Sequence, residues 1–401
     1  CLSLQLCPLM TQGQIEALEH HASDEIKRLY LPKLISGAWC GTMNLTEPQA
    51  GSDVGALSSK AEPNGDGSYA ITGQKIYISW GDSDVVENIC HLVLARLPDG
   101  VPGTKGISLF LVPKFLPDAA GNPGVANRLK VVGLEHKMGL HGSPTCVMQY
   151  EGATGWLVGG EHAGMKAMFT MMNNARLGVG GQGIGVAEGA YQHALRFASE
   201  RKQGKALIGH STGTILDHAD VRRMLMDAKA FTEGMRALCL WGALQADLLH
   251  HAQTEEERQT ADDLLSLLTP VIKGYGTDKG YEVATNAQQV YGGHGYIAEW
   301  GMEQYVRDAR IAMIYEGANG VQALDLVGRK LALDGGKHVM AFFEMIKTFI
   351  KENEGNEALS KDFLNPLKAA SKDLQAAGMY FMQNATKPNN ALSGSYDFMH
   401  M

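Results

Sequence analysis

Residues 68–113 read SYAITGQKIYISWGDSDVVENICHLVLARLPDGVPGTKGISLFLVP. Segments 68–79, 89–96 and 107–113 of this stretch carry many β-branched and aromatic residues, which favour strands. Gly, Pro, Asn and Asp lie between these segments, as is typical of turns. Since no long helical pattern separates the strands, the sequence predicts an antiparallel β-domain rather than alternating strands and helices. We place this domain at residues 37–160.

Beyond residue 160 the hydrophobic period becomes helical. Residues 165–203, 221–253 and 261–292 are long helix candidates. The acidic run TEEERQTADD at 254–263 is expected to connect two of these helices as a solvated segment. We place one helical domain at residues 161–330 and a further helical region at 331–401, which makes the fold class α+β.

The first residues of the chain also have a helical pattern. Residues 11–34, TQGQIEALEHHASDEIKRLYLPKL, predict one helix that ends near Pro32, within a helical segment at residues 1–36. Residue 1 is Cys rather than Met, and we expect the chain to be a piece of a longer protein, cut at both ends.

Composition excludes several classes of protein. The 401 residues carry a formal net charge of -8, which excludes a general nucleic-acid binder, since that function needs a basic surface. No apolar run approaches the roughly 20 residues of a membrane-spanning helix. Widely spaced cysteines without a C-x-x-C pair argue against a zinc site or a redox pair and favour a reduced, cytoplasmic protein. The cysteines are Cys1, Cys7, Cys40, Cys90, Cys146 and Cys239.

One apparent nucleotide-binding motif lies in the wrong context. Gly178, Gly180 and Gly183 spell G-x-G-x-x-G, and Glu200 follows about 20 residues later. That fingerprint binds dinucleotides where it follows a strand and opens a helix. Here it lies within a helical pattern, so we interpret the glycines as positions of close helix packing. Two histidine pairs are likewise interpreted as exposed helix ends rather than metal ligands: His20–His21 and His250–His251.

Two polar segments of the β-domain are candidate ligand contacts. In LTEPQAGSD (45–53), Thr46, Ser52 and nearby backbone N–H groups suit an anion or the edge of a heterocycle, although a capped loop explains them equally well. In KIYISWGDSD (75–84), Tyr77 and Ser79 are two residues apart and therefore share a sheet face. An aromatic face beside a hydroxyl suits a flat ligand, but a half-buried sheet edge would have the same pattern.

Residues 288–320, QQVYGGHGYIAEWGMEQYVRDARIAMIYEGANG, carry the clearest chemical signal. The run Gly292-Gly293-x-Gly295 allows the backbone to approach a ligand closely. Glu316 lies in the apolar context AMIYEG, where a carboxylate is expected to have a raised pKa. Such a group suits a general base that acts on a weak carbon acid. The alternative is a helix-end carboxylate paired with Arg307 or Arg310.

Taken in order, these segments resemble the acyl-CoA dehydrogenase family over about residues 11–330. The resemblance implies a remnant of an N-terminal helical domain at 1–36, the antiparallel β-domain as middle domain, a C-terminal four-helix-bundle domain, and a partial extra helical region. It also implies FAD, bound between domains and across the interface of a homodimer or homotetramer. The matching pieces are SDEIKRLYLPKLISG, LTEPQAGSD, TGQKIYIS, ARLGVGGQGIGVAEGA, ERKQG, QQVYGGHGY and VRDARIAMIYEG.

The resemblance assigns a catalytic role to one carboxylate. Glu316 matches the base that removes the α-proton of an acyl-CoA thioester, while the β-hydride goes to flavin N5. Arg176 matches an arginine near the CoA and the base, and Gly317 lies where the family's backbone meets the substrate. Some relatives place the base next to this arginine, but Ala175 holds that position here and cannot act as a base.

The resemblance also assigns FAD contacts. Thr46 and Ser79 match residues at the flavin ring, with Ser79 near N5, and Tyr77 takes a place often held by tryptophan against the flavin. Ser52 matches a residue near the pyrophosphate or CoA. Four further residues match contacts to the ADP half of FAD in the neighbouring subunit: Arg201, Gln289, Gly292 and Gly293.

Two departures from the family pattern affect cofactor contacts. Ala318 follows Tyr-Glu-Gly where the family often has threonine, so one hydroxyl contact to FAD is expected to be missing. Lys202-Gln203-Gly204 follows the matched arginine where an aromatic-glycine pair is usual, so the packing of the adenine is expected to differ.

The expected function is the FAD-dependent oxidation of an acyl-CoA to a trans-2-enoyl-CoA, with an electron-transfer flavoprotein as electron acceptor. Residues 331–401 resemble the extra helical region of a longer bacterial subgroup, which favours a short sulfur-containing or a straight acyl chain. The alternatives are a flavin-dependent acyl-CoA oxidase and a non-catalytic relative with the same fold. The net charge and the retained Glu316 count against the last of these.

Overall fold

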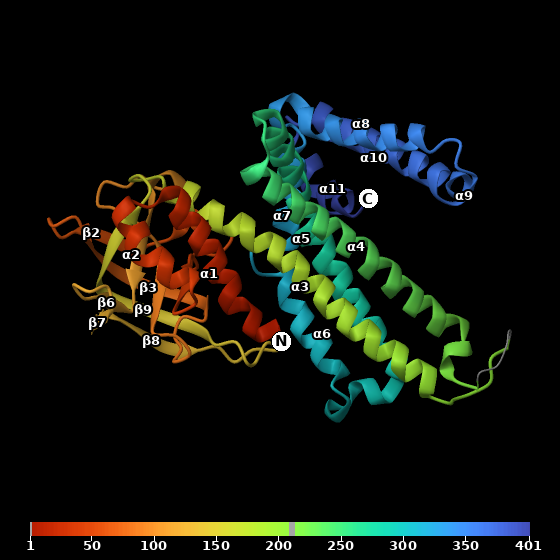
Figure 1. Ribbon diagram of the computed structural model, residues 1–401, viewed down its shortest axis with the longest axis horizontal. Coiled ribbons are helices and arrows are strands. Elements are labelled where there is room, and N and C mark those ends of the chain that lie inside the picture. Colours follow the sequence, from red (N-terminus) through yellow and green to blue (C-terminus); the bar gives the residue numbers. More distant parts are fainter. Residues whose placement is uncertain (1, 208–212) are drawn as a thin grey trace. The chain divides into compact units, whose positions relative to one another are not determined.

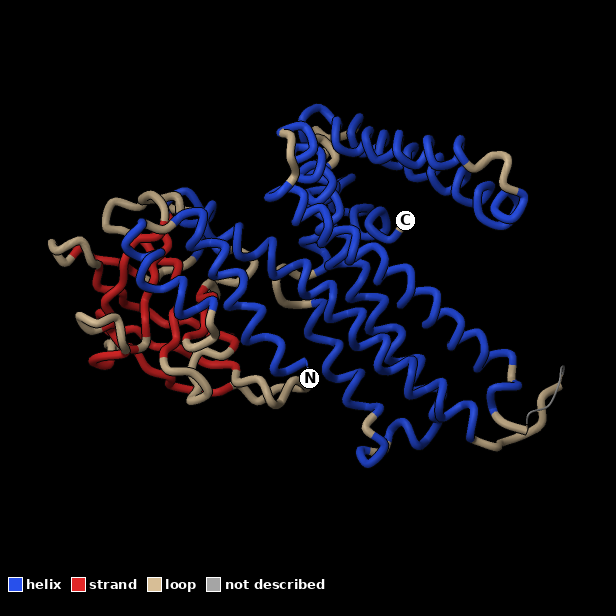
Figure 2. Tube along the Cα trace, viewed as in Figure 1, coloured by secondary structure: helices blue, strands red, loops and turns tan. Residues whose placement is uncertain are grey.

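The computed structural model describes residues 2–207 and 213–401. The chain divides into two compact units, Cys1–Ala175 (unit 1) and Arg176–Met401 (unit 2). The strands belong to unit 1, whereas unit 2 is built from helices (Figure 1 and Figure 2). The predicted α+β class, a β-domain followed by a helical domain, is confirmed.

Unit 1 begins with two helices, α1 (Leu2–His21) and α2 (Asp24–Ile35). Our prediction of one helix that ends near Pro32 is therefore wrong. The hydroxyl of Ser23 accepts a hydrogen bond from the N–H of Ile26 (3.3 Å) and caps the start of α2, which separates the two helices. Pro32 lies inside α2, and the helix continues to Ile35.

The strands of unit 1 pair in a closed ring. Antiparallel pairs join β2 to β3, β3 to β9, β9 to β5 and β5 to β4, and a parallel pairing of Lys60 with Arg96 joins β4 back to β2. The strands are β1 (Trp39–Asn44), β2 (Lys60–Pro63), β3 (Tyr69–Ser79), β4 (Asn88–Arg96), β5 (Ile107–Pro113), β6 (Phe115–Pro117), β7 (Pro123–Ala126), β8 (Leu129–Leu134) and β9 (Thr145–Val158).

A second strand pair is also parallel and departs from the antiparallel pattern. β1 runs parallel to β4 from the Trp39–Asn88 pair to the Asn44–Val93 pair. Parallel neighbours need a crossover connection, and here β2 and β3 supply it. Inside the ring, Ile71, Phe110 and Tyr150 are completely buried and belong to one apolar cluster.

The helix candidates 165–203, 221–253 and 261–292 correspond to α3, α4 and α5. Thr254 and Glu257 form a capping box at the start of α5, so the acidic run forms the first turns of this helix. The prediction that this run connects two helices is wrong. The helices from α3 onward are α3 (Gly164–Glu200), α4 (Ala219–His251), α5 (Glu255–Tyr291), α6 (Met302–Arg310), α7 (Asn319–Asp325), α8 (Lys337–Glu352), α9 (Glu357–Leu359), α10 (Asn365–Gln383) and α11 (Pro388–His400).

The glycines of the G-x-G-x-x-G motif lie within α3, and Gly180 and Gly183 pack against α5. A Cβ at Gly180 would come within 2.5 Å of Ile272 Cγ2, and a Cβ at Gly183 within 2.5 Å of the carbonyl oxygen of Gly276. The absence of side chains therefore lets the two helices approach closely. This confirms the packing interpretation of the motif.

Helices α8, α9, α10 and α11 follow residue 331. Phe398 and Met399 of α11 share a buried apolar cluster with Leu267 of α5 and Ala323 of α7. Helix α11 lies beside α5 and α7 (Figure 1). The packing of α11 thus reaches α5 and also α7, the helix that follows the sequence Tyr-Glu-Gly.

Within residues 2–207 and 213–401, no helix combines the length and the apolar character needed to cross a membrane. The cysteines in this part of the chain are free thiols, and Cys1 lies outside it.

Candidate functional site

A buried ion pair joins the loop 45–53 to strand β3. The ammonium of Lys75 lies 2.8 Å from Glu47 Oε1 and donates to the carbonyl oxygen of Leu45 over 3.1 Å. The N–H of Ile76 donates to the carbonyl oxygen of Thr46 over 2.9 Å. The two polar segments that the sequence singles out separately therefore lie side by side in unit 1.

Glu47 fixes this loop from its other side as well. Its carboxylate accepts hydrogen bonds from the backbone N–H groups of Ser58 (2.7 Å) and Ser59 (3.0 Å). Burial raises the pKa of Glu47, but Lys75 and these hydrogen bonds outweigh it and hold the pKa at about 2. Sequence reasoning missed this pair. The available signal was a lysine in phase with the inward-facing Ile71 of β3.

A β-bulge separates the predicted flavin contacts of β3. The pairing with β9 shifts between Lys75 and Ile78, and Tyr77 within the bulge has a φ of 60°. Tyr77 is exposed and Ser79 is half-buried, whereas Ile78 between them is buried. Bulges turn side chains out of the regular alternation, so Tyr77 is presented to solvent although Lys75, two residues earlier, is buried. In the loop 45–53, Thr46 is half-buried and Ser52 is exposed.

Unit 2 contains a cavity of about 650 Å³ at the end of α5. Four predicted cofactor contacts line it together: Arg201, Gln289, Gly292 and Gly293. A Cβ at either glycine would meet no atom within 4 Å, so the backbone there faces open space. Arg201 offers a planar cation that suits phosphate, and the exposed backbone allows close approach of a ligand.

Aromatic rings form one wall of this cavity. The rings of Phe197 and Tyr291 stack with centroids 4.0 Å apart, and Trp300 packs edge-on against both. The hydroxyl of Tyr291 donates to the carbonyl oxygen of His193 on α3 (3.2 Å). Together, a cation, open backbone and an aromatic wall suit a flat heterocycle attached to phosphate.

Glu316 lies in a turn with two consecutive left-handed residues. The φ angles are 54° at Glu316 and 83° at Gly317. The side-chain amide of Gln322 donates to both carbonyl oxygens, at 3.0 Å from Glu316 O and 3.2 Å from Gly317 O. A Cβ at position 317 would come within 2.6 Å of that amide nitrogen, so the turn requires glycine for space as well as for φ.

The carboxylate of Glu316 faces two cations. Oε2 is buried and makes no hydrogen bond, while Arg176 of α3 and Lys273 of α5 act on the carboxylate electrostatically. Burial raises the pKa of Glu316 to about 7, against the opposing effect of the two cations. Arg307 instead donates to Glu303 on its own helix. The alternative of Glu316 as a helix-end carboxylate paired with Arg307 or Arg310 is not what the structure shows, since the cations that act on it are Arg176 and Lys273.

Arg176 is held at this turn by a second carboxylate. It is buried, and its guanidinium nitrogen lies 3.9 Å from Asp325 Oδ2. Burial lowers the pKa of Arg176, whereas Asp325 and Glu316 favour its charged form. The structure thus brings three predicted residues together in unit 2, namely Arg176, Glu316 and Gly317. The neighbouring Ala175 is completely buried in α3.

Sequence reasoning missed the buried lysine of this turn. Lys273 lies in the apolar run LLTPVIKGYG of α5, and a charged residue in an otherwise apolar stretch was the signal that could have found it. Its ammonium donates to the carbonyl oxygen of Gly317 over 2.7 Å.

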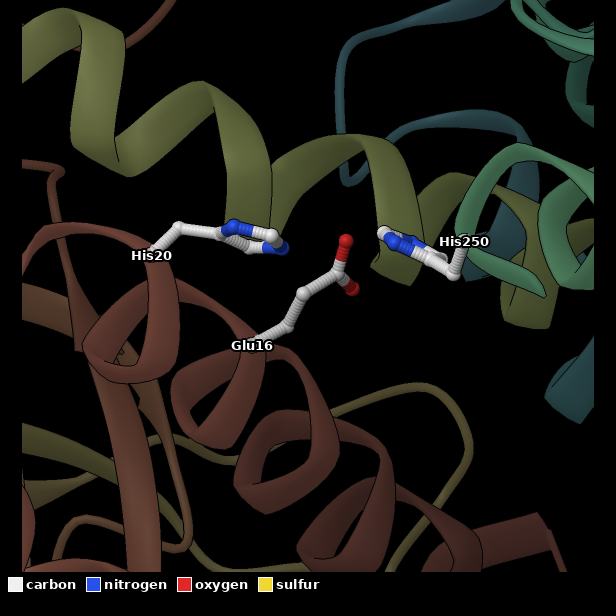
Figure 3. A group of neighbouring side chains, drawn as sticks. All are labelled: Glu16, His20 and His250. Atoms are coloured by element: carbon white, nitrogen blue, oxygen red, sulfur yellow. The ribbon is translucent and has the colours of Figure 1, made fainter. Parts of the chain in front are cut away.

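The histidine pairs lie in the last turns of α1 and α4, as predicted. Figure 3 labels Glu16 and His20, which project from α1 one turn apart, and His250 of α4. Within unit 1, Glu16 accepts a hydrogen bond from the amide of Asn174 (2.7 Å).

Two family models match the chain. The middle domain of acyl-CoA dehydrogenase matches residues 42–153, and the C-terminal domain of acyl-CoA dehydrogenase matches residues 162–331. The first match covers most of the β-structure of unit 1. The second covers the cavity and the Glu316 turn of unit 2.

Individual relatives agree with these matches. The chain is 46% identical over 99% of its length to a 3-methylmercaptopropionyl-CoA dehydrogenase of Ruegeria pomeroyi, of which it covers 68%. It is 38% identical over 87% of its length to a butyryl-CoA dehydrogenase of Syntrophomonas wolfei, of which it covers 59%.

The fold is shared with a solved structure. Caenorhabditis elegans ACDH-11 in complex with C11-CoA superposes with a TM-score of 0.81 and 22% identity, over 99% of this chain and 68% of that one. The helices after residue 331 are therefore part of the shared fold. With its two domain matches and its 46% identity to a curated relative, the chain belongs to the acyl-CoA dehydrogenase family.

Proposed function

We propose that this chain carries out the α,β-dehydrogenation of an acyl-CoA thioester to a trans-2-enoyl-CoA, with Glu316 as the base. The observation that supports this most directly is the carboxylate of Glu316. Its buried Oε2 has no hydrogen-bond partner, and its pKa is raised to about 7 by burial. A general base is most effective when its pKa is close to the working pH.

The geometry of the turn suits proton abstraction from a weak carbon acid. The α-proton passes to Glu316 Oε2, and the electron pair of the C–H bond is left on the thioester as developing enolate charge. Arg176 lies close to this carboxylate and matches the family's arginine near CoA, so it contributes a positive field there. The carbonyl groups of Glu316 and Gly317 are occupied by Gln322, which fixes the orientation of the turn.

The residues of the chain fit FAD in two places. In unit 2 we propose that the adenosine-phosphate half occupies the cavity, with Arg201 and Gln289 as polar contacts and Gly292 and Gly293 as open backbone. In unit 1 we propose contacts to the flavin half from Thr46, Ser52, Tyr77 and Ser79. Bound FAD supplies the acceptor for the hydride that leaves the β-carbon.

The departures from the family pattern bear on this cofactor assignment. Ala318 caps the start of α7 without a side-chain hydrogen bond, so we expect no hydroxyl contact to FAD from this position. Gln203 lines the cavity where the family pattern has an aromatic residue. The aromatic wall of Phe197 and Tyr291 offers an alternative surface for adenine stacking.

The relatives support a proposal for the substrate class. The Ruegeria pomeroyi relative is named for a short sulfur-containing acyl-CoA, and the Syntrophomonas wolfei relative for butyryl-CoA. We propose a short acyl-CoA, either sulfur-containing or straight. The chain spans 68% and 59% of these two relatives, and the activity of the whole protein belongs to this proposal.

We further propose an electron-transfer flavoprotein as electron acceptor, a homodimer or homotetramer, and domains at 37–160 and 161–330.

The base assignment is tested with Glu316→Gln in the FAD-loaded full chain. We expect the variant to retain FAD but to lose the bleaching of flavin absorbance when 3-methylmercaptopropionyl-CoA or butyryl-CoA is added without oxygen. Glu299→Gln, which alters an exposed glutamate of the same motif, is the control and should bleach like the parent. Bleaching of the flavin absorbance in Glu316→Gln at the parental rate would contradict the assignment of Glu316 as the base.

A further inference from the structure

Lys273 holds the Glu316 turn from α5. Its ammonium donates to the carbonyl oxygen of Gly317 and to Asn319 Oδ1, both over 2.7 Å. The residue is completely buried, and Gly317 directly follows Glu316. A buried ammonium without hydrogen-bond acceptors is costly, so these two acceptors determine where it lies.

Asn319 connects this ammonium to a carboxylate. Its amide nitrogen donates to Asp278 Oδ1 over 2.7 Å, while its amide oxygen accepts from Lys273. The same nitrogen also lies 2.9 Å from Thr277 Oγ1 and 3.1 Å from the carbonyl oxygen of Gly274. Because the amide faces a cation with its oxygen and an anion with its nitrogen, only one of its two orientations satisfies both neighbours.

Helix α11 supplies the other partners of Asp278. The hydroxyl of Tyr396 donates to Asp278 Oδ2 over 2.5 Å, and His400 Nε2 lies 2.9 Å from the same oxygen. The two rings are one turn apart on α11 and stack with centroids 4.8 Å apart. Lys273, Asn319, Asp278, Tyr396 and His400 therefore form one continuous set of hydrogen bonds, called here the Lys273 network.

The backbone of α5 is shaped to receive α11. A Cβ at Gly274 would come within 2.3 Å of Met399 Sδ, so glycine at this position gives α11 room to dock. Phe398 and Met399 bury their side chains in the cluster shared with α5 and α7. Apolar packing thus places Tyr396 and His400 against Asp278.

We propose that Lys273 is a positioning residue of the Glu316–Gly317 turn and that α11 fixes its geometry through Asp278 and Asn319. The proposal rests on the proposed function for the role of Glu316 as base. It assigns to α11, outside the matched domains, a part in the reaction. The hydrogen bond from Lys273 holds the peptide that follows the base, and a displacement of about 1 Å at a reacting group lowers rates about 100-fold.

The first test measures amide hydrogen exchange by mass spectrometry in the full chain without FAD. The variant Tyr396→Phe/His400→Leu removes both α11 partners of Asp278, and it retains an aromatic ring at 396 and an apolar side chain at 400. We expect hydrogen exchange at amides 315–320 to become about tenfold faster, because the hydrogen bonds from α11 to Asp278, which support the turn through Asn319 and Lys273, are lost. Lys273→Met should give the same effect, since it removes the direct contact to Gly317.

The control is Asp397→Asn, which removes a charge from an exposed position of the same helix. It should leave exchange at 315–320 unchanged. If the double variant accelerates exchange in α11 alone, α11 only packs against unit 2 and the proposal is wrong. Should the double variant fail to fold, Tyr396→Phe alone applies the same criterion.

The second test follows flavin reduction by acyl-CoA in the FAD-loaded full chain. At saturating substrate, we expect the double variant to be reduced at least tenfold more slowly, with unchanged FAD content and substrate affinity. Loss of substrate affinity without a change in rate would contradict a positioning role. Since hydrogen exchange requires neither FAD nor turnover, the inference about α11 and the base assignment tested by Glu316→Gln can fail separately.

Discussion

Glu47 and Lys75 form an ion pair in the interior of unit 1, with 2.8 Å between Oε1 and Nζ and side-chain exposures of 2% and 0%. The removal of one partner leaves a buried charge without compensation, which typically costs about 3–5 kcal/mol. We expect Lys75→Met to lower the free energy of unfolding by this amount, as measured by urea denaturation. Lys130→Met is the matched control, because its pair with Glu151 has the same 2.8 Å distance but is more than half exposed, and it should cost about 0–1 kcal/mol.

The same pair gives unit 1 a defined acid sensitivity. Burial opposes ionisation of Glu47, but Lys75 and the hydrogen bonds of residues 58–59 lower its pKa from 4.5 to about 2. Because the folded pKa lies below the unfolded value, its stabilising contribution is complete above pH 4.5 and is lost as the pH falls towards 2. The stability difference between the parent and Glu47→Gln/Lys75→Met should therefore shrink over this interval. A difference that stays constant from pH 5 to pH 2 would contradict the assigned pKa.

Glu316 should show the opposite dependence of stability on pH. Burial raises its pKa from 4.5 to about 7, although Arg176 and Lys273 oppose this. Between these two values the folded state retains a proton that the unfolded state releases, so stability decreases as the pH rises. Glu316→Gln removes this dependence and should be more stable than the parent at pH 8 but not at pH 4. Thermal unfolding at the two pH values measures the difference. Equal shifts at both would show that Glu316 titrates normally.

Two classes of glycine in α3 should respond differently to alanine. At Gly183 a Cβ would lie 2.5 Å from the carbonyl oxygen of Gly276, so Gly183→Ala should force α3 away from α5 and cost about 1–3 kcal/mol. At Gly185 an added Cβ would meet no neighbouring group within 4 Å, and Gly185→Ala should stabilise the helix by up to about 1 kcal/mol. Denaturant midpoints of the two variants provide the comparison. Destabilisation of both to the same extent would argue against close packing as the reason for Gly183.

Local patterns were sufficient to predict the two classes of secondary structure and the role of the α3 glycines. The strand segments within 68–113 are rich in β-branched and aromatic residues, which favour strands. The helical period of hydrophobic residues continues on both sides of the motif at 178–183. The acidic run at 254–263 was wrongly predicted to connect two helices, because charge alone does not distinguish a linker from the start of a helix. Thr254 and Glu257 have the spacing of a capping box, and that spacing decides between the two.

The charged groups around Glu316 were only partly predictable. An apolar context correctly indicates that its carboxylate is buried, and Arg176 follows from the resemblance. Lys273 lies 44 residues before Gly317, and Asp278 meets His400 122 residues later in the chain. No local periodicity encodes such pairings, because they depend on how α5 and α11 pack in space. Only the isolated charge in an apolar helix marks Lys273 as exceptional.

With Glu316 as the proposed base, its left-handed backbone sets stability against chemistry at one position. A non-glycine residue with φ near 54° is strained by roughly 1–3 kcal/mol, and asparagine or glycine would relieve part of that strain. Selection for thermal stability alone would therefore favour replacement of glutamate at residue 316. Selection that also requires turnover would retain it. Laboratory evolution of this protein for heat resistance should accordingly accumulate inactive variants at this codon unless activity is screened in every round.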